Sequence, residues 1–176
     1  GENLYFENPG AGRFVEKARE AGLATARWKD RDGKEHPAWS VSAAFLDYDN
    51  DGLLDIFVCN YVTWSPNYDL TQGFTLAGIG RAYGPPTTFP GAHCTLYRNK
   101  GNGVFENVTR KAGIEVFDEF RKAAGKALGV IVCDVDEDGW PDIVVANDTV
   151  RNFFFHNQRN GVFVEKGQEA GIAFAD

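Results

Sequence analysis

The sequence predicts an all-β fold built from antiparallel strands that are joined by tight turns. Three observations predict it. The composition, with 20 Gly, 14% aromatic residues and no Met, is typical of strands and turns. A motif with an aromatic strand end and an Asn/Gly turn occurs three times, and an acidic motif occurs twice between apolar runs. The 176 residues can bury a sizeable core, and 43% hydrophobic residues exclude intrinsic disorder.

The aromatic motif predicts three β-hairpins. Its copies span residues 4–14, 96–105 and 154–163, and each ends its aromatic run at an Asn/Gly turn before a Phe opens the next strand. Asn and Gly tolerate the positive φ that tight turns require. Each copy continues to an Ala-Gly pair, at residues 21–22, 112–113 and 170–171. A short helical turn that is capped by the Gly is expected there.

The acidic motif predicts two equivalent loops between strands. Residues 47–55 and 134–142 both have the pattern D-x-D-x-D-G-x-x-D. Apolar runs precede them at 41–46 and 128–133, and further apolar runs follow at 56–60 and 143–147. Each loop therefore connects two strands that read as continuously buried.

Four carboxylates within nine residues repel one another unless a cation compensates them. Ca²⁺ accepts six to eight oxygen ligands in flexible geometry. Asp at positions 1, 3 and 5 can point inward, Gly at position 6 permits the bend, and Asp at position 9 completes the site. The candidate ligands are Asp47, Asp49, Asp51, Asp55 and the backbone carbonyl of Leu53 in the first loop, and Asp134, Asp136, Asp138, Asp142 and the backbone carbonyl of Trp140 in the second.

Three other interpretations of these loops fit the sequence less well. An EF-hand needs Glu at position 12 and flanking helices, but position 12 is Val58 in one loop and Val145 in the other. Mg²⁺ fits less well because it demands near-ideal octahedral geometry and keeps several waters. The third interpretation is that the loops are polar turns without any metal. The presence of two matching copies with four Asp each argues against it.

The acidic motif followed by Asp-Ile-x-Val-x-Asn resembles the FG-GAP or VCBS repeat of integrin α-subunits. The segment Leu-Tyr-x-Asn-x-Gly-x-Gly-x-Phe resembles more narrowly the cartilage-acidic-protein-like group, which is associated with an ASPIC/UnbV domain. The resemblance implies a calcium-binding β-propeller. It also implies that each set of four aspartates binds one Ca²⁺.

With four antiparallel strands per blade, the chain is expected to form a partial propeller of about two and a half blades with short helical turns. Residues 1–38 supply the outer hairpin of a preceding blade plus a linker. Residues 39–124 form one blade with an insertion at 61–94, and 125–176 form another, within one repeat domain overall. Because closed propellers need roughly four to eight blades, we expect a piece of a longer propeller or self-association of blade edges.

The insertion at 61–94 is rich in Gly, Pro and aromatic residues. Long connections inside compact domains are usually functional or disordered, and the aromatic content favours order. Exposed rings suit contact with carbohydrate or protein. Simple packing of these rings over the blade is the alternative, and the sequence leaves both open.

Charge and hydropathy limit the partners. The formal charge is −7, and removing the eight loop aspartates leaves 17 acidic against 18 basic residues. Without a basic cluster, a nucleic-acid partner is not expected. No apolar run reaches 18 residues, so membrane insertion is not expected either.

Among the cysteines, Cys59 and Cys133 lie in apolar stretches and are expected to be buried free thiols. No C-x-x-C pair that would suggest zinc accompanies them or Cys94. The three histidines share no metal-binding spacing and are interpreted as ordinary polar positions.

These observations favour a non-catalytic calcium-binding module that mediates protein or carbohydrate interaction or adhesion. The alternative is a non-catalytic part of a propeller-based polysaccharide lyase or hydrolase. Calcium loops of this kind suit millimolar calcium, so an extracellular, cell-surface or periplasmic location is expected. Any secretory signal would lie upstream of this sequence.

Overall fold

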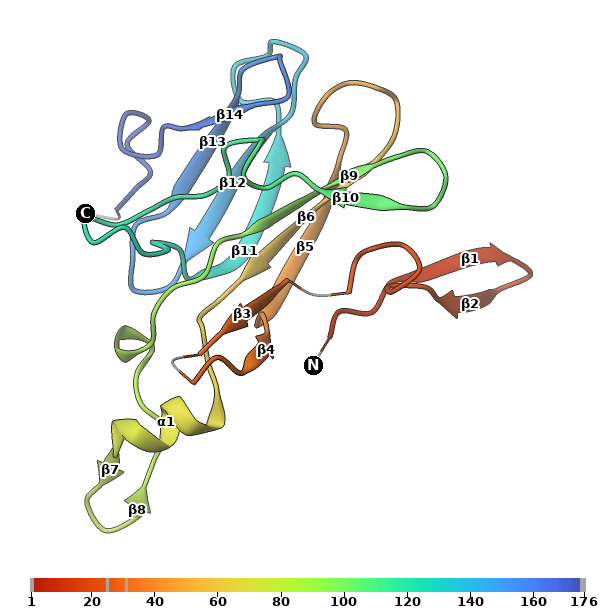
Figure 1. Cartoon of the computed structure of the whole chain (residues 1–176). Helices are drawn as coiled ribbons and strands as arrows, with labels where there is room; N and C mark the ends of the chain where they lie inside the picture. Colours follow the sequence, from red (N-terminus) through yellow and green to blue (C-terminus); the bar gives the residue numbers. More distant parts are fainter. Residues whose placement is uncertain (1, 25, 31, 175–176) are drawn as a thin grey trace.

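The computed structural model describes residues 2–24, 26–30 and 32–174 and confirms the all-β prediction (Figure 1). Its strands form antiparallel sheets. Within the described ranges, none of these sheets closes into a ring. No helix in the same part of the chain has the length and apolar character needed to cross a membrane.

Two four-stranded sheets form the centre of the molecule, and each connects its strands in chain order. The first sheet consists of β5 (Ser40–Leu46), β6 (Asp55–Asn60), β9 (Thr95–Asn99) and β10 (Phe105–Asn107). The second sheet consists of β11 (Ala127–Cys133), β12 (Asp142–Asn147), β13 (Phe153–Asn157) and β14 (Phe163–Glu165). Their registers correspond, since Ile56 pairs with Tyr97 as Ile143 pairs with Phe155.

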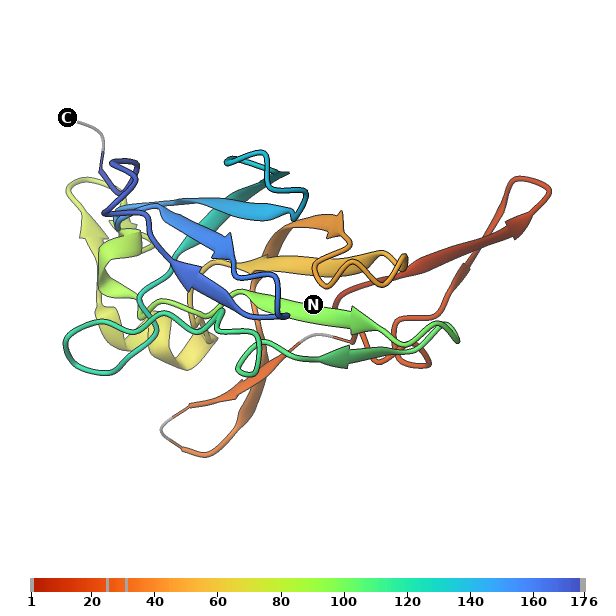
Figure 2. The same ribbon diagram turned by 90° about the horizontal axis from the view of Figure 1, so that it is seen from above.

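The main core lies between these two sheets (Figure 2). Phe57 and Leu96 enter it from the first sheet, and Ile143 and Phe155 from the second, all with no exposed surface. The Phe57 and Phe155 rings lie 6.2 Å apart. Each apolar side chain of this size stabilises the folded state by about 1.5–3 kcal/mol when fully buried.

The first strand of each sheet is less buried than the sequence predicted. In β6 every residue is buried as expected, but β5 and β11 alternate between covered and open positions. Phe45 is 59% exposed and Ile131 is 65% exposed. β5 and β11 are edge strands that lie next to each other, so one face of each strand is covered and the other is open.

All three predicted hairpins are present: β1 (Phe6–Gly10) with β2 (Arg13–Glu16), β9 with β10, and β13 with β14. The role assigned to Asn was wrong. Positive φ occurs at Gly101 and at Arg159, the equivalent position. Asn99 and Asn157 instead hold the turns through their side chains, because the Oδ1 of each accepts the N–H two residues later at 2.9 Å.

The Ala-Gly pairs form short helical turns, as predicted, and two of them contact the next sheet. In the second copy the N–H of Ala112 donates to the Val108 carbonyl at 2.8 Å. The Ala112 carbonyl then accepts the N–H of Phe163 at 2.8 Å, as the Ala21 carbonyl accepts that of Phe105 at 2.8 Å. These turns therefore connect each hairpin to the outer strand of the following sheet.

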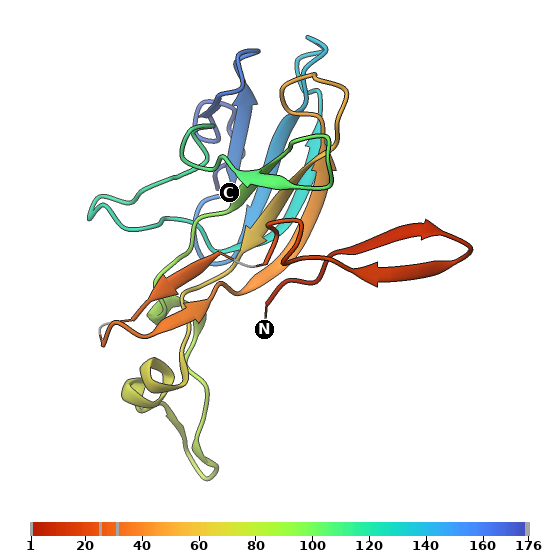
Figure 3. The ribbon, with the colours of Figure 1, turned by 45° about the vertical axis from the view of Figure 1, so that its right-hand side comes forward.

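Two segments contain structure that the sequence analysis did not identify. The predicted linker holds a hairpin of β3 (Arg27–Lys29) and β4 (Glu35–Pro37). The insertion at 61–94 contains α1 (Pro66–Gln72), β7 (Thr75–Leu76), β8 (Gly80–Arg81) and a 3₁₀ turn (Pro86–Thr88). As Figure 3 shows, the part with α1, β7 and β8 projects from the sheets. α1 begins where the Ser65 hydroxyl accepts the Tyr68 N–H.

The cysteines agree only in part with the prediction. Cys59 and Cys94 are buried free thiols, whereas Cys133 is exposed. Cys133 ends β11, and the alternation of that strand turns it toward solvent. A hydrogen bond with Cys59 and burial raise the pKa of Cys94 well above its usual value, so this thiol stays protonated and weakly reactive.

We predict that Gly113→Ala destabilises the protein more than Gly171→Ala. Both glycines have left-handed φ values, +76° and +73°, so both substitutions cost on the order of 1 kcal/mol. A Cβ at Gly113 would also lie 2.5 Å from the Phe163 carbonyl oxygen, whereas a Cβ at Gly171 meets no described atom within 4 Å. Thermal unfolding should show a melting temperature at least roughly 2–4 °C lower for Gly113→Ala. Equal melting temperatures would contradict the inter-sheet contact.

Candidate metal centre

The two acidic loops lie at the same end of the sheets. One joins β5 to β6 and the other joins β11 to β12 (Figures 1 and 3). The Asn50 side chain of the first loop donates to the Gly139 carbonyl of the second at 3.2 Å. The two loops are therefore in direct contact.

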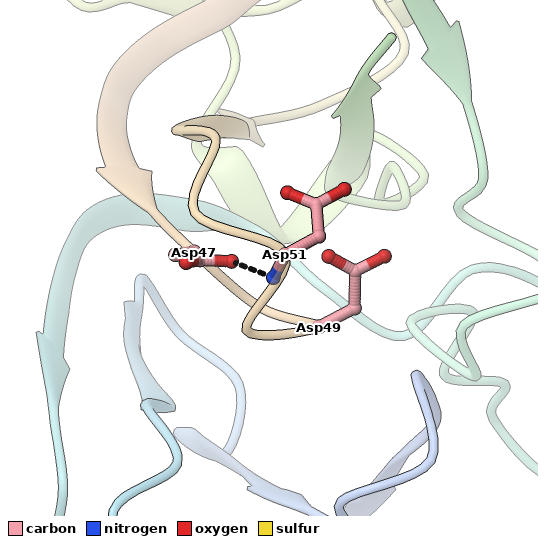
Figure 4. Close-up of side chains that lie close together, drawn as sticks. All are labelled: Asp47, Asp49 and Asp51. Atoms are coloured by element: carbon pink, nitrogen blue, oxygen red, sulfur yellow. Dashed lines mark hydrogen bonds between the residues drawn. The ribbon is translucent and has the colours of Figure 1, made fainter. Parts of the chain in front are cut away.

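Each loop brings three of its four predicted aspartates together. Carboxylate oxygens of Asp47, Asp49 and Asp51 lie within 4.8 Å of one another. Figure 4 shows the Asp49 and Asp51 carboxylates extending the same way from the loop. The equivalent carboxylates of the second loop meet the same limit. They belong to Asp134, Asp136 and Asp138.

The same backbone hydrogen bonds shape both loops. Asp47 accepts the N–H groups of Asp51 and Gly52 at 3.0 and 2.9 Å, and Asp134 accepts those of Asp138 and Gly139 at 3.0 and 2.8 Å. Gly52 and Gly139 both have φ of +86°, a left-handed conformation that Gly adopts without penalty. The sharp bend predicted at position 6 is thus present in both loops.

The ninth-position aspartates are buried outside the three-carboxylate clusters. Asp55 and Asp142 are 0% and 1% exposed. Both oxygens of Asp55 accept backbone N–H groups, from Asn99 at 2.7 Å and from Tyr48 at 3.1 Å. Asp142 accepts the equivalent pair of N–H groups at 2.8 and 3.1 Å. A carboxylate has about four lone-pair sites, so these contacts leave acceptor capacity, and ligation by these residues stays a prediction.

The seventh-position residues contribute backbone contacts to the loops. The N–H of Leu53 donates to Asp51 Oδ1 at 2.9 Å, and the N–H of Trp140 donates to Asp138 Oδ1 at 2.8 Å. These contacts orient the fifth-position carboxylates. Ligation through the carbonyl oxygens of Leu53 and Trp140 stays a prediction.

The protonation of Asp55 is perturbed. Its pKa is raised to about 6 overall. Burial and the charges of Asp49 and Asp51 raise the pKa, while the N–H groups of Asn99 and Tyr48 lower it. The burial contribution is the largest. Near neutral pH, a cation beside the loop would favour the ionised form of this carboxyl group.

Basic side chains, which the sequence analysis did not assign to the loops, also contact the carboxylates. Arg98 lies 2.7 Å from Asp49 and 2.9 Å from Asp51. At the equivalent position of the second sheet, His156 Nε2 lies 2.9 Å from Asp136 and lowers the pKa of that carboxyl group by hydrogen bonding. The signal was in the aromatic motif, because Arg98 and His156 both directly precede the turn Asn.

An arginine also lies beside the second loop. Arg159 Nε donates to Asp138 Oδ2 at 2.6 Å. Arg159 occupies the left-handed turn position of the β13–β14 hairpin. Each loop is thus partly compensated by side chains from its own sheet.

The donor set fits a hard divalent cation. Every side chain in the two clusters offers a carboxylate oxygen as a metal ligand, and Ca²⁺ prefers oxygen ligands of this type. In the first loop, Asp49 Oδ1 is buried and has no hydrogen-bond partner among the described residues. A buried acceptor without a partner costs about 1–3 kcal/mol, and metal ligation would offset this cost.

Comparison with known proteins gave one family match. Residues 88–145 match a model described as an FG-GAP-like repeat. The matched segment runs from the end of the insertion through β9, β10 and β11, across the second acidic loop and into β12. A search of curated proteins gave no match. The chain therefore contains a segment that is similar to FG-GAP-like repeats.

Proposed function

We propose that this chain is a non-catalytic, calcium-binding repeat module of a β-propeller that mediates protein or carbohydrate interaction or adhesion. The observation that carries the proposal is the pair of acidic loops with equivalent hydrogen bonds and clustered carboxylates. Asp47, Asp49, Asp51 and Asp55 would hold one Ca²⁺ with the Leu53 carbonyl. Asp134, Asp136, Asp138 and Asp142 would hold another with the Trp140 carbonyl.

The propeller part of this proposal rests on the repeat geometry. The two four-stranded sheets would be neighbouring blades. The β1–β2 hairpin would be the outer half of a preceding blade, because its Ala-Gly turn contacts the first sheet as that of the β9–β10 hairpin contacts the second. The hairpin motif, present three times, supports placement in the cartilage-acidic-protein-like group.

Calcium would have a structural role here. Neutralising the carboxylates would stabilise the bend of each loop, and a ligand that binds only the folded state stabilises that state. Sites of this type suit millimolar calcium. We therefore place the module outside the cytoplasm, in an extracellular, cell-surface or periplasmic setting.

An alternative is membership in a polysaccharide-acting enzyme. A cavity of about 640 Å³ is lined among others by His93, Glu115 and Asn60. Burial lowers the pKa of His93, while Glu115 raises it. A neutral imidazole beside a carboxylate could transfer protons. Turnover of an acidic polysaccharide by the chain would favour the enzyme over the binding module.

We predict that calcium raises the melting temperature. At a calcium concentration of ten times Kd, each site would add about 1.4 kcal/mol to the free energy of unfolding, or roughly 3–6 °C. Titration calorimetry should give two ions per chain, and Asp49→Asn or Asp136→Asn should leave one. Asp32→Asn, at an exposed carboxylate outside both loops, is the matched control and should leave two. An unchanged melting temperature with calcium and with a chelator would refute the metal sites.

The calcium effect should depend on pH. The pKa of Asp55 without metal is about 6, above the unfolded value of about 3.9. Without metal, the stabilising contribution of its protonated form is complete below pH ~4 and is lost as the pH rises through 6. Calcium needs the ionised form, so its affinity at the first site should be ~tenfold weaker at pH 5 than at pH 7.5. Calorimetry at both pH values checks this, and Asp55→Asn should remove most of the difference.

Self-association would cover the open faces of the edge strands. The exposed apolar side chains of β5 and β11 include Val41, Phe45, Leu128 and Ile131, and burial of such side chains would favour association. Light scattering should show a concentration-dependent rise in mass, which Phe45→Ser combined with Ile131→Ser should reduce. A monomer at all concentrations would contradict this part of the proposal.

A further inference from the structure

A small pocket lies between the start of β5 and the insertion at 61–94. It has a volume of about 130 Å³, and its lining includes Trp39, Tyr61, Trp64, Tyr83 and Asp69. We propose that this pocket binds an organic cation, namely the alkylated ammonium group of a ligand. The proposal specifies the interaction part of the proposed function and does not depend on its calcium sites.

The aromatic residues form walls at steep angles to one another. Trp39 and Tyr61 have ring centroids 5.9 Å apart and planes at 90°, and Trp39 and Trp64 lie 6.0 Å apart at 75°. Aromatic faces carry negative electrostatic potential, which attracts cations, and groups of such faces recognise quaternary ammonium ligands. A flat platform for stacking would instead need rings that share one plane.

A carboxylate supplies the opposite charge. The side chain of Asp69, on α1, is only 4% exposed, and its Oδ2 lies 2.5 Å from the Arg81 guanidinium. Its other oxygen, Oδ1, is buried and lacks a hydrogen-bond partner within the described part of the chain. Leaving a buried charged acceptor unsatisfied is costly. A cation held by the aromatic walls would compensate this oxygen.

Four charged side chains near the pocket, two positive and two negative, balance one another. Two cations lie near the pocket: Lys126, whose Nζ donates to the Pro86 carbonyl at 2.7 Å, and the half-exposed Arg81. Asp69 and Asp148 oppose them, and Asp148 accepts a hydrogen bond from the Tyr61 hydroxyl. An arriving ammonium group thus meets no net positive charge from these four side chains.

Size and chemistry select the ligand class. At ~30 Å³ for each water-sized group, the pocket has room for roughly four such groups, which is close to a trimethylammonium group. A metal ion would need several oxygen ligands, but Asp69 is the only carboxylate among the described residues that line the pocket. A sugar would need several free hydrogen-bonding groups, but in this lining the Tyr61 hydroxyl is already bonded to Asp148 and Asp69 Oδ2 is already bonded to Arg81.

The test is a titration of the intact chain with choline chloride at constant ionic strength, followed by tryptophan fluorescence and calorimetry. The control ligand is 3,3-dimethylbutan-1-ol, which has the same shape without the charge. We expect saturable binding of choline that is at least tenfold tighter than binding of the neutral analogue. Equal affinities, or no saturable binding, would overturn the proposal. Binding of neutral oligosaccharides without binding of choline would overturn it in favour of a carbohydrate site.

Variants locate the binding. Asp69→Asn and Trp64→Ala should each weaken choline binding at least tenfold, and Trp28→Phe, at a tryptophan outside the pocket, should not change it. Tyr83 is 81% exposed, so Tyr83→Ala tests the pocket without disturbing the core and should also weaken binding. An unchanged affinity in all three pocket variants would refute the assignment. Calcium-dependent melting of the same samples reports on the metal sites separately.

Discussion

A buried aspartate in each four-stranded sheet is the constraint on which the rest of the structure depends. Asp55 accepts one backbone N–H from the acidic loop and another from the end of β9, and Asp142 makes the same two contacts in the second sheet. One carboxylate thus connects the loop to the first three strands. The turn Asn reinforces the connection, because the Asn99 amide donates to the Leu54 carbonyl at 2.9 Å. Removing such a carboxylate would leave two buried N–H groups without partners.

Repetition explains why much of this architecture was predictable. The acidic loops and the hairpins are shaped by hydrogen bonds between residues that are two to five positions apart, such as those of Asp47 and Asn99. Local contacts of this kind leave a direct pattern in the sequence, and a second copy separates the pattern from chance. The strand order of both sheets follows from the same hairpins. Of each predicted set of four aspartates, the three that lie closest in sequence are the three that cluster.

Features that depend on distant residues were not predictable. Arg98 contacts Asp51 across 47 positions. Its place before the turn Asn repeats at His156, but the sequence does not show which carboxylate each side chain contacts. Cys133 and Phe45 lie in runs whose hydrophobicity predicts burial, but exposure depends on what covers each face of an edge strand. The aromatic content of the insertion predicted order, yet the arrangement of Trp39 and Trp64 at a steep angle depends on how the insertion returns to the start of β5.

The Ala-Gly turns give the repeats a direction. Each turn presents a carbonyl that accepts a Phe N–H of the next sheet: the N–H of Phe105 donates to Ala21, and that of Phe163 donates to Ala112. Donor and acceptor lie on different surfaces of a repeat, so the contact is heterologous and joins units head to tail. Successive sheets can therefore be added in only one order. The rotation at each junction then decides between a closed ring and an open array, and the total stability grows as a sum of nearest-neighbour contributions.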